Sequence, residues 1–289
     1  MSPRRFSLLT YNVGLLRVPV ARFNPIPHVE ERLAVLPSEI ARADADVVAL
    51  QEVFSARDRD ALHAGVRQRY PHIGHVRPAG LRLDGGQVTL SRFPLRARFE
   101  LFRYAPFSER FYMKGALVTE VEIPEVGHVT VVNLHATAGG LLAMPESPRA
   151  EAMRARQFDG VLDAVRSLRG PLLLTGDFNA GPGVAERNYQ QIVAAGFVDV
   201  HGHLQPDDPS CTWDPRNPLN VGGLHARCPP QRIDHVFVRR DDLATGRVRP
   251  RGSRIVMREA VVAVGGRHPV TPSDHYGLHV ELDLAASSR

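Results

Sequence analysis

The chain has 289 residues, of which 43% are hydrophobic and 23% are charged, and its formal net charge is +5 at pH 7. This balance excludes an intrinsically disordered chain, and no apolar run approaches the ~20 residues that cross a bilayer. A positive balance favours acidic partners, namely phosphate esters, nucleic acid or an anionic membrane, but a solvated arginine-rich surface explains it equally well.

The N-terminal residues and the cysteines indicate the cellular compartment in which the protein resides. The first residues resemble a signal peptide only weakly, because Thr10 and Asn12 interrupt the apolar run and no small-residue cleavage site follows. Cys211 and Cys228 match no zinc-binding spacing and cannot define a disulfide framework. We therefore expect two ordinary thiols in a cytoplasmic protein, with secretion and a single disulfide bridge as the alternatives.

The first part of the chain alternates short apolar runs with helical segments. Pro37 lies inside the first helical segment and indicates a break or a fresh helix start there. Ser55 is a suitable N-cap for the second helix, and Pro71 stops it. The predicted strands are Phe6 to Val13 and Asp46 to Val53, and the predicted helices are Glu30 to Ala43 and Ser55 to Tyr70.

The middle of the chain is rich in short β-type runs bounded by Gly and Pro, which predicts an antiparallel meander. Its predicted strands are Gln87 to Leu90, Ala97 to Phe102, Ala116 to Ile123 and Val129 to Leu134.

A long helix comes next, with Ser147 as its cap, Pro148 at its first position and Gly170 at its end. Its apolar stripe contains Phe158, Val161, Leu162, Val165 and Leu168. The remaining predictions are strands over Pro171 to Thr175, Arg232 to Arg239, Ile255 to Val264 and Tyr276 to Leu284, and a helix over Val184 to Ala195.

The Pro-, Gly- and Asn-rich segment from Gln205 to Gln231 is more typical of a functional loop than of a domain boundary. We therefore predict one domain over residues 1–289. Strands outnumber helices, and several strands lack a crossover helix between them. This pattern favours an α/β fold in which two mixed sheets pack together and helices flank them.

Polar residues recur where the predicted strands end, which is where sheet-based folds place reactive groups. Each alone is more simply a cap or a satisfied buried group, but so many at strand ends indicate a site. They are Asn12, Gln51, Glu52, Asn133, His135, Asp177, Asn179, Asp234, His235, Asp274 and His275.

The residue types narrow the chemistry. Carboxylates and amides are hard oxygen ligands, which suit Mg²⁺ or Mn²⁺ rather than zinc. The sequence contains no G-x-S-x-G elbow of a serine hydrolase and no G-x-x-x-x-G-K-[ST] phosphate loop. Oxygen ligands and histidines without a nucleophile motif indicate metal-assisted attack by water.

The segments TYN, LQEV, LSRFP, NLHA, GDFN, RIDHVF and SDHYG occur in this order from Thr10 to Gly277. In this the chain resembles the endonuclease/exonuclease/phosphatase superfamily, which includes deoxyribonucleases, apurinic endonucleases, inositol phosphatases and neutral sphingomyelinases. The resemblance implies a four-layer α-β-β-α sandwich, a Mg²⁺-dependent phosphoesterase and a phosphodiester substrate, either lipid or nucleic acid.

The resemblance also implies roles for individual residues. Glu52 matches the principal Mg²⁺ ligand, and Asn12 and Asp274 match residues at that metal. His275 matches the base that activates water, and Asp234 the carboxylate that orients it. Asp177 and Asn179 match the pair that positions water or the leaving group and holds the phosphate, and His135 matches a histidine that contacts the phosphate. His235 follows Asp234 within a strand, so it should point the opposite way and be structural.

Three segments resemble the neutral sphingomyelinase-like branch: Lys114-Gly115, the TWDPRNPLN loop and the final SDHYGL. Lys114 is the only lysine in the chain, and a compact ammonium acts as a point charge where an arginine would present a planar fork. We expect Lys114 to supply its charge to the phosphate or to a carboxylate of the site, with a surface lysine whose replacement changes nothing as the alternative. The chain has one tryptophan, Trp213, and no clear counterpart of the tryptophan-bearing membrane hairpin of secreted bacterial enzymes.

Two segments are candidates for a substrate rim. Aromatic rings between Leu101 and Tyr112 could hold a quaternary ammonium group or stack on bases, unless alternation along a strand buries Phe99 and Leu101. Apolar residues Leu141, Leu142 and Met144 could dip into lipid or pack in the core. We expect a monomer in peripheral contact with a membrane at most; a nuclease and an inositol phosphate phosphatase remain the alternative functions.

Overall fold

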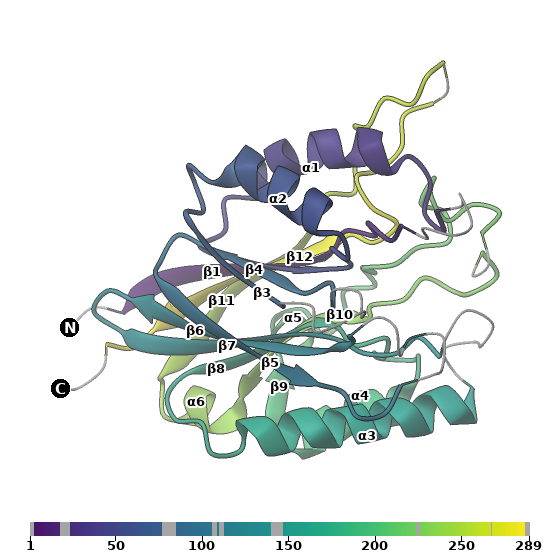
Figure 1. The fold of residues 1–289 in the computed structure, drawn as a ribbon. Coiled ribbons are helices and arrows are strands. Elements are labelled where there is room, and N and C mark those ends of the chain that lie inside the picture. The colour runs from purple at the N-terminus through teal and green to yellow at the C-terminus, as the bar shows by residue number, and fades with distance from the viewer. Residues whose placement is uncertain are drawn as a thin grey trace.

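The computed structural model describes residues 3–17, 24–76, 85–105, 109, 113–139, 147–223, 226–266 and 268–286. Two six-stranded sheets pack face to face at its centre, and helices cover their outer faces, as Figure 1 shows. The predicted four-layer α-β-β-α sandwich is therefore confirmed. No helix in these ranges is long and apolar enough to cross a membrane.

The first sheet has the strand order β11-β12-β1-β2-β4-β3. Strands β1 and β2 are parallel, and helix α1 connects them, as a parallel pair requires. The other neighbours are antiparallel, so the sheet is mixed. Its strands are β1 (Arg4–Asn12), β2 (Val47–Gln51), β3 (His72–His75), β4 (Val88–Ser91), β11 (Val248–Val256) and β12 (Gly277–Leu284), and its helices are α1 (Val29–Ala43) and α2 (Ala56–Val66).

The second sheet has the order β5-β6-β7-β8-β10-β9, and α3 crosses between the parallel strands β7 and β8. Its strands are β5 (Leu95–Leu101), β6 (Gly115–Ile123), β7 (Gly127–His135), β8 (Leu172–Asp177), β9 (Phe197–Asp199) and β10 (Asp234–Arg239). The helices of this half are α3 (Pro148–Val165), α4 (Glu186–Ala194) and the short α5 (Val200–Leu204) and α6 (Arg240–Ala244).

Helix caps follow the sequence closely. The Ser55 Oγ accepts a hydrogen bond from the backbone N–H of Asp58, and the Ser147 Oγ accepts one from Ala150. Helix α1 runs through Pro37 without interruption, so the predicted break is wrong. Proline removes one backbone donor, but the buried stripe that includes Leu33, Leu36 and Ile40 keeps the helix packed on the sheet.

Three apolar clusters fill the layers. One lies between the sheets, and it includes Leu8, Val236 and Val280. A second lies between the first sheet and helices α1 and α2, and a third lies between the second sheet and helix α3. The predicted stripe of α3 is confirmed, since Phe158, Val161 and Val165 are buried and Leu162 and Leu168 are partly buried.

Several predicted boundaries are wrong. The four-strand meander is a three-strand one, β5-β6-β7, because β4 pairs with β2 in the first sheet. The strand predicted over Ile255 to Val264 is instead β11, which ends at Val256. This edge strand accommodates Pro250 at a bulge, where no partner needs its missing donor. Helices α2 and α3 end at Val66 and Val165, before the proline and glycine expected to stop them.

Candidate active site

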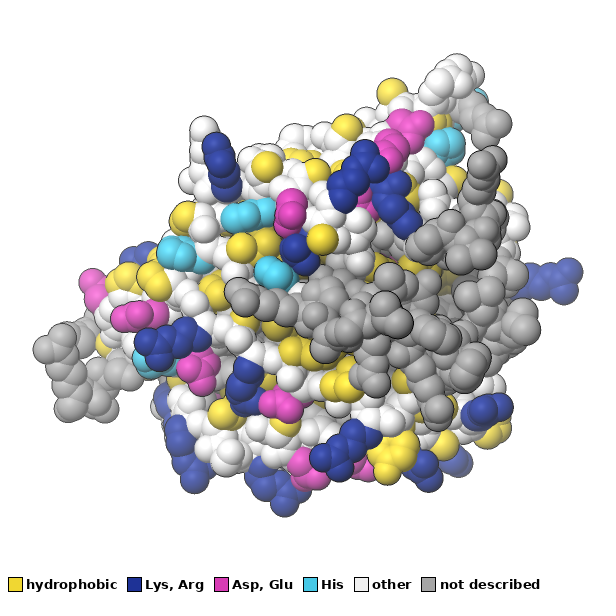
Figure 2. All heavy atoms as spheres, viewed as in Figure 1, with side chains coloured by type: hydrophobic (Ala, Val, Ile, Leu, Met, Phe, Trp, Pro, Cys, Tyr) yellow, Lys and Arg dark blue, Asp and Glu magenta, His cyan; other side chains and the backbone are white. Residues whose placement is uncertain are grey.

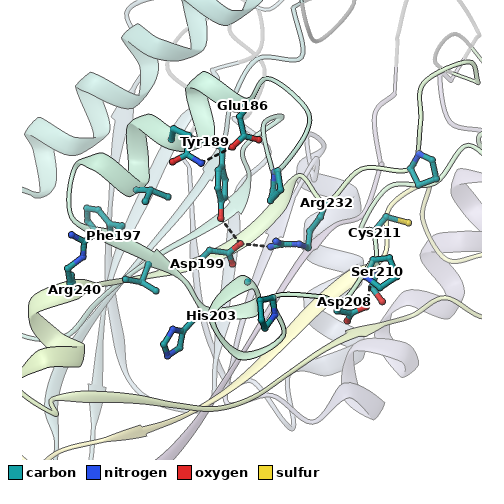
Figure 3. Close-up of a pocket in the computed structure, with 18 residues that line it drawn as sticks. Glu186, Tyr189, Phe197, Asp199, His203, Asp208, Ser210, Cys211, Arg232 and Arg240 are labelled. Atoms are coloured by element: carbon teal, nitrogen blue, oxygen red, sulfur yellow. Dashed lines mark hydrogen bonds and ion pairs between the residues drawn. The ribbon is translucent and has the colours of Figure 1, made fainter.

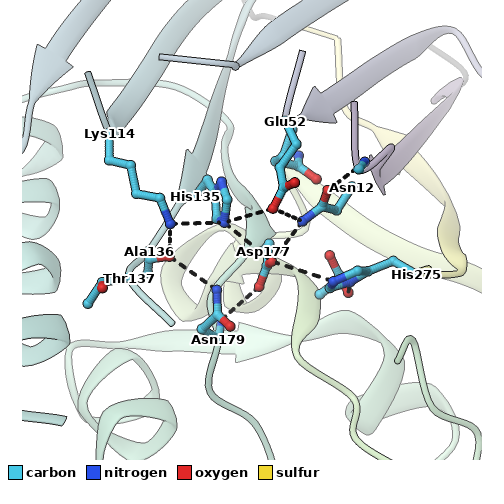
Figure 4. Close-up of polar contacts among 12 residues, drawn as sticks. Asn12, Glu52, Lys114, His135, Ala136, Thr137, Asp177, Asn179 and His275 are labelled. Atoms are coloured by element: carbon cyan, nitrogen blue, oxygen red, sulfur yellow. Dashed lines mark hydrogen bonds and ion pairs between the residues drawn. The ribbon is translucent and has the colours of Figure 1, made fainter. Parts of the chain in front are cut away.

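The predicted site residues gather at one end of the sandwich. Parallel strands end at the same edge of a sheet, so β1 and β2 bring Asn12 beside Gln51, and β7 and β8 bring His135 beside Asp177. Strand β10 is antiparallel to β8 and begins at this edge, which pairs Asp234 with Asp177. The structure thus brings most of the strand-end residues together at this edge, and Figure 4 shows Asn12, Glu52, His135, Asp177, Asn179 and His275 side by side.

Four side chains meet at the centre of this cluster, two from each sheet. The Asn12 Nδ2 donates to the Oε1 of Glu52 at 3.2 Å and to the Oδ2 of Asp177 at 3.0 Å. The His135 Nε2 lies 3.7 Å from the Glu52 Oε1 and 3.6 Å from the Asp177 Oδ2. Asn12 therefore ties the first sheet to the second at the point where the carboxylates converge.

Backbone geometry at the cluster depends on glycine and on strained residues. Gly176 has φ of 131°, and a Cβ there would lie 1.9 Å from the Leu134 carbonyl oxygen, so only glycine lets β7 and β8 approach at this point. Glu52 and Asn179 have φ of 62° and 49°, in the left-handed region that costs non-glycine residues energy. Such strain persists where the surrounding structure enforces it, and it often marks functional sites.

His275 and Asp234 form a hydrogen-bonded pair. The Nδ1 of His275 lies 2.9 Å from the Asp234 Oδ2, and its Nε2 lies 4.0 Å from the Asp177 Oδ2. The Thr212 Oγ1 accepts a hydrogen bond from the Asp234 backbone N–H at 3.1 Å, which anchors the start of β10. The carboxylate thus fixes the ring so that Nε2 faces the centre of the cluster.

The buried charges shift the pKa values of these groups. Burial opposes the imidazolium form, yet the carboxylates of Asp234, Asp274 and Asp177 outweigh it and hold the pKa of His275 well above its usual range. Burial, and then the charge of Lys114, holds the pKa of His135 well below its usual range. The surroundings of the two histidines therefore shift their pKa values in opposite directions.

Asp274 lies beside the end of β1. Its Oδ1 lies 3.1 Å from the Ser273 Oγ, whose hydroxyl also lies 2.7 Å from the backbone oxygen of Asn12. A Cβ on Gly14 would lie 2.5 Å from the Asp274 Oδ1, so glycine leaves room for this carboxylate. The fully buried Arg32 donates to the carbonyls of Gly14 and Pro272, which holds the two loops together.

Lys114 is buried at the other side of the cluster, only 7% exposed, so its interpretation as a surface lysine is wrong. Its Nζ lies 3.3 Å from both the His135 Nε2 and the Ala136 carbonyl oxygen, and 3.5 Å from the Glu109 Oε2. The one lysine of the chain therefore points its ammonium at the histidine of the cluster (Figure 4), and the buried Glu109 carboxylate lies beside the same ammonium.

Asn179 follows Asp177 in the turn after β8. Its backbone N–H donates to the Asp177 Oδ1 at 2.9 Å, and its Nδ2 donates to the Ala136 carbonyl at 3.1 Å. The Ala136 carbonyl thus receives donors from both Lys114 and Asn179. This shared acceptor brings the turn, the lysine and the end of β7 into one rigid unit.

The donor set fits a hard divalent cation. Burial, and then the charge of Asp274, raises the pKa of Glu52, and burial with the charge of Asp234 raises the pKa of Asp177 to about 7. Buried carboxylates this close repel one another, and a dication offsets that repulsion.

Asp177, Asp234 and His275 also offer ligand atoms within 4.8 Å of one another, the one such group of three or more in the described ranges. Because the Nδ1 of His275 already binds Asp234, we assign this group to proton transfer.

His235 points away from the cluster, as predicted. Its Nε2 lies 3.0 Å from the Ala180 carbonyl oxygen, and its Nδ1 lies 3.3 Å from the Oδ2 of Asp199, which also pairs with Arg232 and accepts from the Tyr189 hydroxyl. Asp199 and Arg232 line a cavity of about 700 Å³ beside α4 and α5 (Figure 3), and none of the predicted site residues lines it. This network packs against β10 on the face of the strand that points away from the cluster.

The two rim segments lie largely outside the described residues, including Leu141, Leu142 and Met144. In the described part, the alternative that buries Leu101 is wrong, because this side chain is 44% exposed. Tyr104 is exposed as well, and the Arg156 guanidinium lies 4.9 Å from its ring centroid. Cys211 and Cys228 are buried, and no disulfide joins them, so the alternative of a single bridge is wrong.

The sequence did not point to four supporting residues of the site: Arg32, Glu109, Thr212 and Ser273. Arg32, Thr212 and Ser273 act on backbone groups of distant segments, and a residue pattern does not reveal such contacts. Thr212 and Ser273 stand within the quoted TWDPRNPLN and SDHYG segments, which are the signals that could have found them.

Comparison with known proteins agrees with this geometry. The model of the Endonuclease/Exonuclease/phosphatase family matches residues 9–275. A sphingomyelinase of Dictyostelium discoideum is 24% identical over 197 residues, which cover 61% of this chain and 42% of that protein. The chain spans about half the length of the curated relatives it matches or less.

Solved structures share the fold over nearly the whole chain. Sphingomyelinase C from Streptomyces griseocarneus is 25% identical with a TM-score of 0.76, over 96% of this chain and 99% of that one. A beta-toxin variant from Staphylococcus aureus with bound magnesium ions is 18% identical with a TM-score of 0.73, over 96% and 99% of the two chains.

Proposed function

We propose that this chain, which belongs to the endonuclease/exonuclease/phosphatase family, is a metal-dependent phosphodiesterase in which His275 activates the attacking water. One observation carries the proposal. His275, oriented by Asp234, faces Asp177 across 4.0 Å, and Glu52 with Asn12 stands on the other side of Asp177. A base and a set of hard oxygen ligands thus converge on one point.

The base acts through its Nε2. A water that bridges the His275 Nε2 and the Asp177 Oδ2 can form hydrogen bonds of ordinary length to both atoms, because they lie 4.0 Å apart. Neutral His275 takes the proton of this water, and Asp234, bound to Nδ1, stabilises the imidazolium that results. Asp177 orients the oxygen lone pair toward phosphorus.

The opposite side of the cluster receives the phosphate. Negative charge grows on the non-bridging oxygens during the reaction, so positive groups aimed there lower the barrier. The Lys114 ammonium supplies a point charge, and His135 and Asn179 stand beside it to contact the phosphate. Glu52, Asn12 and Asp274 would hold Mg²⁺ or Mn²⁺, which supplies further charge neutralisation and polarises the phosphoryl group.

A choline phospholipid is the substrate that we favour. The curated relatives carry the names sphingomyelinase and putative neutral sphingomyelinase, and the Lys114-Gly115 segment supports the same branch. A nucleic acid backbone requires a continuous basic groove, and on the face of the molecule that Figure 2 shows, the described basic side chains lie scattered among acidic and hydrophobic ones.

A substrate panel tests the proposal. Purified protein with Mg²⁺ is offered micellar sphingomyelin, a lysophospholipid, duplex and abasic DNA, and inositol phosphates at equal enzyme. We expect phosphocholine release from sphingomyelin to exceed all other reactions, and His275→Ala, as a matched preparation, to lack it. Cleavage of DNA or inositol phosphates without lipid hydrolysis would reject the lipid assignment, and no turnover of any member would reject the phosphodiesterase.

A further inference from the structure

The site is assembled from two separate sheets. The first sheet supplies Asn12 and Glu52 at the ends of β1 and β2, and the second supplies His135 and Asp177 at the ends of β7 and β8. The Glu52 Oε1 to His135 Nε2 separation of 3.7 Å is therefore a distance between sheets. Any change in the spacing of the sheets at this edge changes that distance directly.

Two fully buried amides join the sheets one step inside the site. The Gln51 Nε2 on β2 donates to the Oδ1 of Asn133 on β7 at 2.8 Å. The Asn133 Nδ2 donates back across the gap to the carbonyls of Leu50 at 2.9 Å and Val88 at 3.1 Å. Asn133 is thus bound to both β2 and β4 of the opposite sheet.

The position of this bridge links it to the site. Gln51 directly precedes Glu52, and Asn133 lies two residues before His135 on the same strand, so both side chains of β7 point to the same face. In the register with β8, Asn133 pairs with Thr175, two residues before Asp177. The bridge therefore binds β2 one residue before Glu52 and β7 two residues before His135.

Stability alone does not account for the bridge. The rest of the space between the sheets contains an apolar cluster, and replacing two side chains bonded to each other by apolar groups of the same shape can be nearly neutral or stabilising. The Gln51 Oε1 also has no hydrogen-bond partner among the described residues, which is unfavourable for a buried atom. Directional bonds, unlike apolar packing, fix a spacing.

We propose that Asn133 and Gln51 are positioning residues, which set the spacing of the two sheets at the site and thereby the distance between Glu52 and His135. The proposal rests on the proposed function for its kinetic consequence, but its geometric consequence is independent of the substrate. A shift on the order of 1 Å in such a site can lower turnover about 10²-fold.

The chain offers a matched control. The Thr119 Oγ1 on β6 donates to the Thr89 Oγ1 on β4 at 3.2 Å, so these two fully buried residues also bond across the sheets. Thr89 pairs with Ala49 and Thr119 with Val131, each two residues further from the site than Gln51 and Asn133. Thr119→Val removes one cross-sheet bond of the same kind without touching the bridge.

The experiment compares Asn133→Leu, Gln51→Met and Thr119→Val with the unaltered chain. Unfolding midpoints in urea are measured first, and then kcat and KM on micellar sphingomyelin, with rates corrected for the folded fraction. We expect Asn133→Leu to lower kcat about tenfold to 100-fold with KM changed less than threefold, and Gln51→Met to have a smaller effect in the same direction. Thr119→Val should keep kcat within about twofold of the value for the unaltered chain, even if its urea midpoint falls as far as that of Asn133→Leu.

Two readouts do not need turnover. Added Mg²⁺ should raise the thermal unfolding midpoint, and the Mg²⁺ concentration that gives half of the full rise measures the affinity for the metal. We expect this concentration to be higher in Asn133→Leu and Gln51→Met, because Glu52 moves in both variants, and to be unchanged in Thr119→Val. A crystal structure of Gln51→Met, which keeps the Asn133 bonds to backbone and so its fold, should show Glu52 farther from His135. If the unaltered chain hydrolyses no phosphodiester, the proposed function fails while these readouts still test the bridge. Equal kcat and equal Mg²⁺ response in all three variants, with an unchanged distance, would overturn it.

Discussion

The Nδ1 of His275 lies 2.9 Å from the Oδ2 of Asp234, and the two residues come from segments 41 positions apart in the chain. Asp234 begins β10 and His275 lies two residues before the start of β12, so this contact joins the second sheet to the first. It gives the base its orientation and, with Asp274 and Asp177, determines its protonation.

Replacing Asp234 by asparagine tests this relationship. The variant removes one negative charge next to His275, so the pKa of His275 should fall from its raised value, as an NMR titration of the ring would show. Because the base acts in its neutral form, the rising limb of the rate against pH should move to lower pH. We expect kcat to fall roughly 10²–10⁴-fold.

Asp163→Asn is a suitable control for the loss of a carboxylate, because its side chain is 69% exposed on α3. An Asp234→Asn protein with the ring titration of the unaltered chain and normal turnover would contradict the role of Asp234.

Lys114→Arg tests whether the site requires an ammonium. The Nζ lies within 3.5 Å of three partners in a buried site, and a guanidinium is wider and carries its donors in a fixed fork. We expect kcat to fall at least tenfold although the charge is kept. Arg187→Lys, at a side chain that is 91% exposed on α4, should leave kcat unchanged. Wild-type turnover by a folded Lys114→Arg protein would show that the proposed role of Lys114 is wrong.

The buried His279 makes stability depend on pH. It lies on β12, 2% exposed, and neither ring nitrogen has a hydrogen-bond partner among the described residues. Burial, and then the charge of Arg254, lowers its pKa to about 4, with Glu281 and Asp46 opposing. An unfolded histidine titrates near ~6.5. The unfolded chain therefore binds the proton first, and the contribution of neutral His279 is present above about pH 6.5 and lost as pH falls toward 4.

His279→Leu should make the free energy of unfolding less dependent on pH between pH 7 and pH 4. The difference between pH 7 and pH 4 in the free energy of unfolding should shrink by up to about 3 kcal/mol, measured by urea unfolding. His128→Leu, at an exposed position on β7, should leave the pH dependence in place. Identical pH profiles for His279→Leu and the unaltered chain would refute the assignment.

Helices and strands that are bounded by clear capping or terminating residues could be predicted from the sequence. The cap at Ser147, the proline after it and the apolar stripe of α3 predicted that helix, and GDFN and SDH predicted the site residues that the structure brings together. Residues at the ends of parallel strands meet at one edge whatever the rest of the fold does, which is why Asn12, His135 and Asp177 were found.

The rest depends on tertiary contacts that leave no local pattern. Strand β11 contains a proline, a glycine and three arginines, and only its place at a sheet edge makes it a strand. The sequence predicted a strand over Ile255 to Val264 instead, but Met257, with a φ of 61°, follows the end of β11 at Val256 and interrupts that run. The Gln51 and Asn133 bridge likewise appeared in the sequence only as two more polar residues near strand ends, since nothing local pairs them.

The initial rate of phosphocholine release from micellar sphingomyelin as a function of free Mg²⁺, in chelator-treated protein, tests the central claim most directly. The account predicts no turnover without the metal, saturable recovery on adding Mg²⁺, and a response shifted to much higher Mg²⁺ in Glu52→Gln, which keeps the shape of the side chain but not its charge. Turnover that persists in excess EDTA, or a Glu52→Gln protein with the Mg²⁺ response of the unaltered chain, would contradict it.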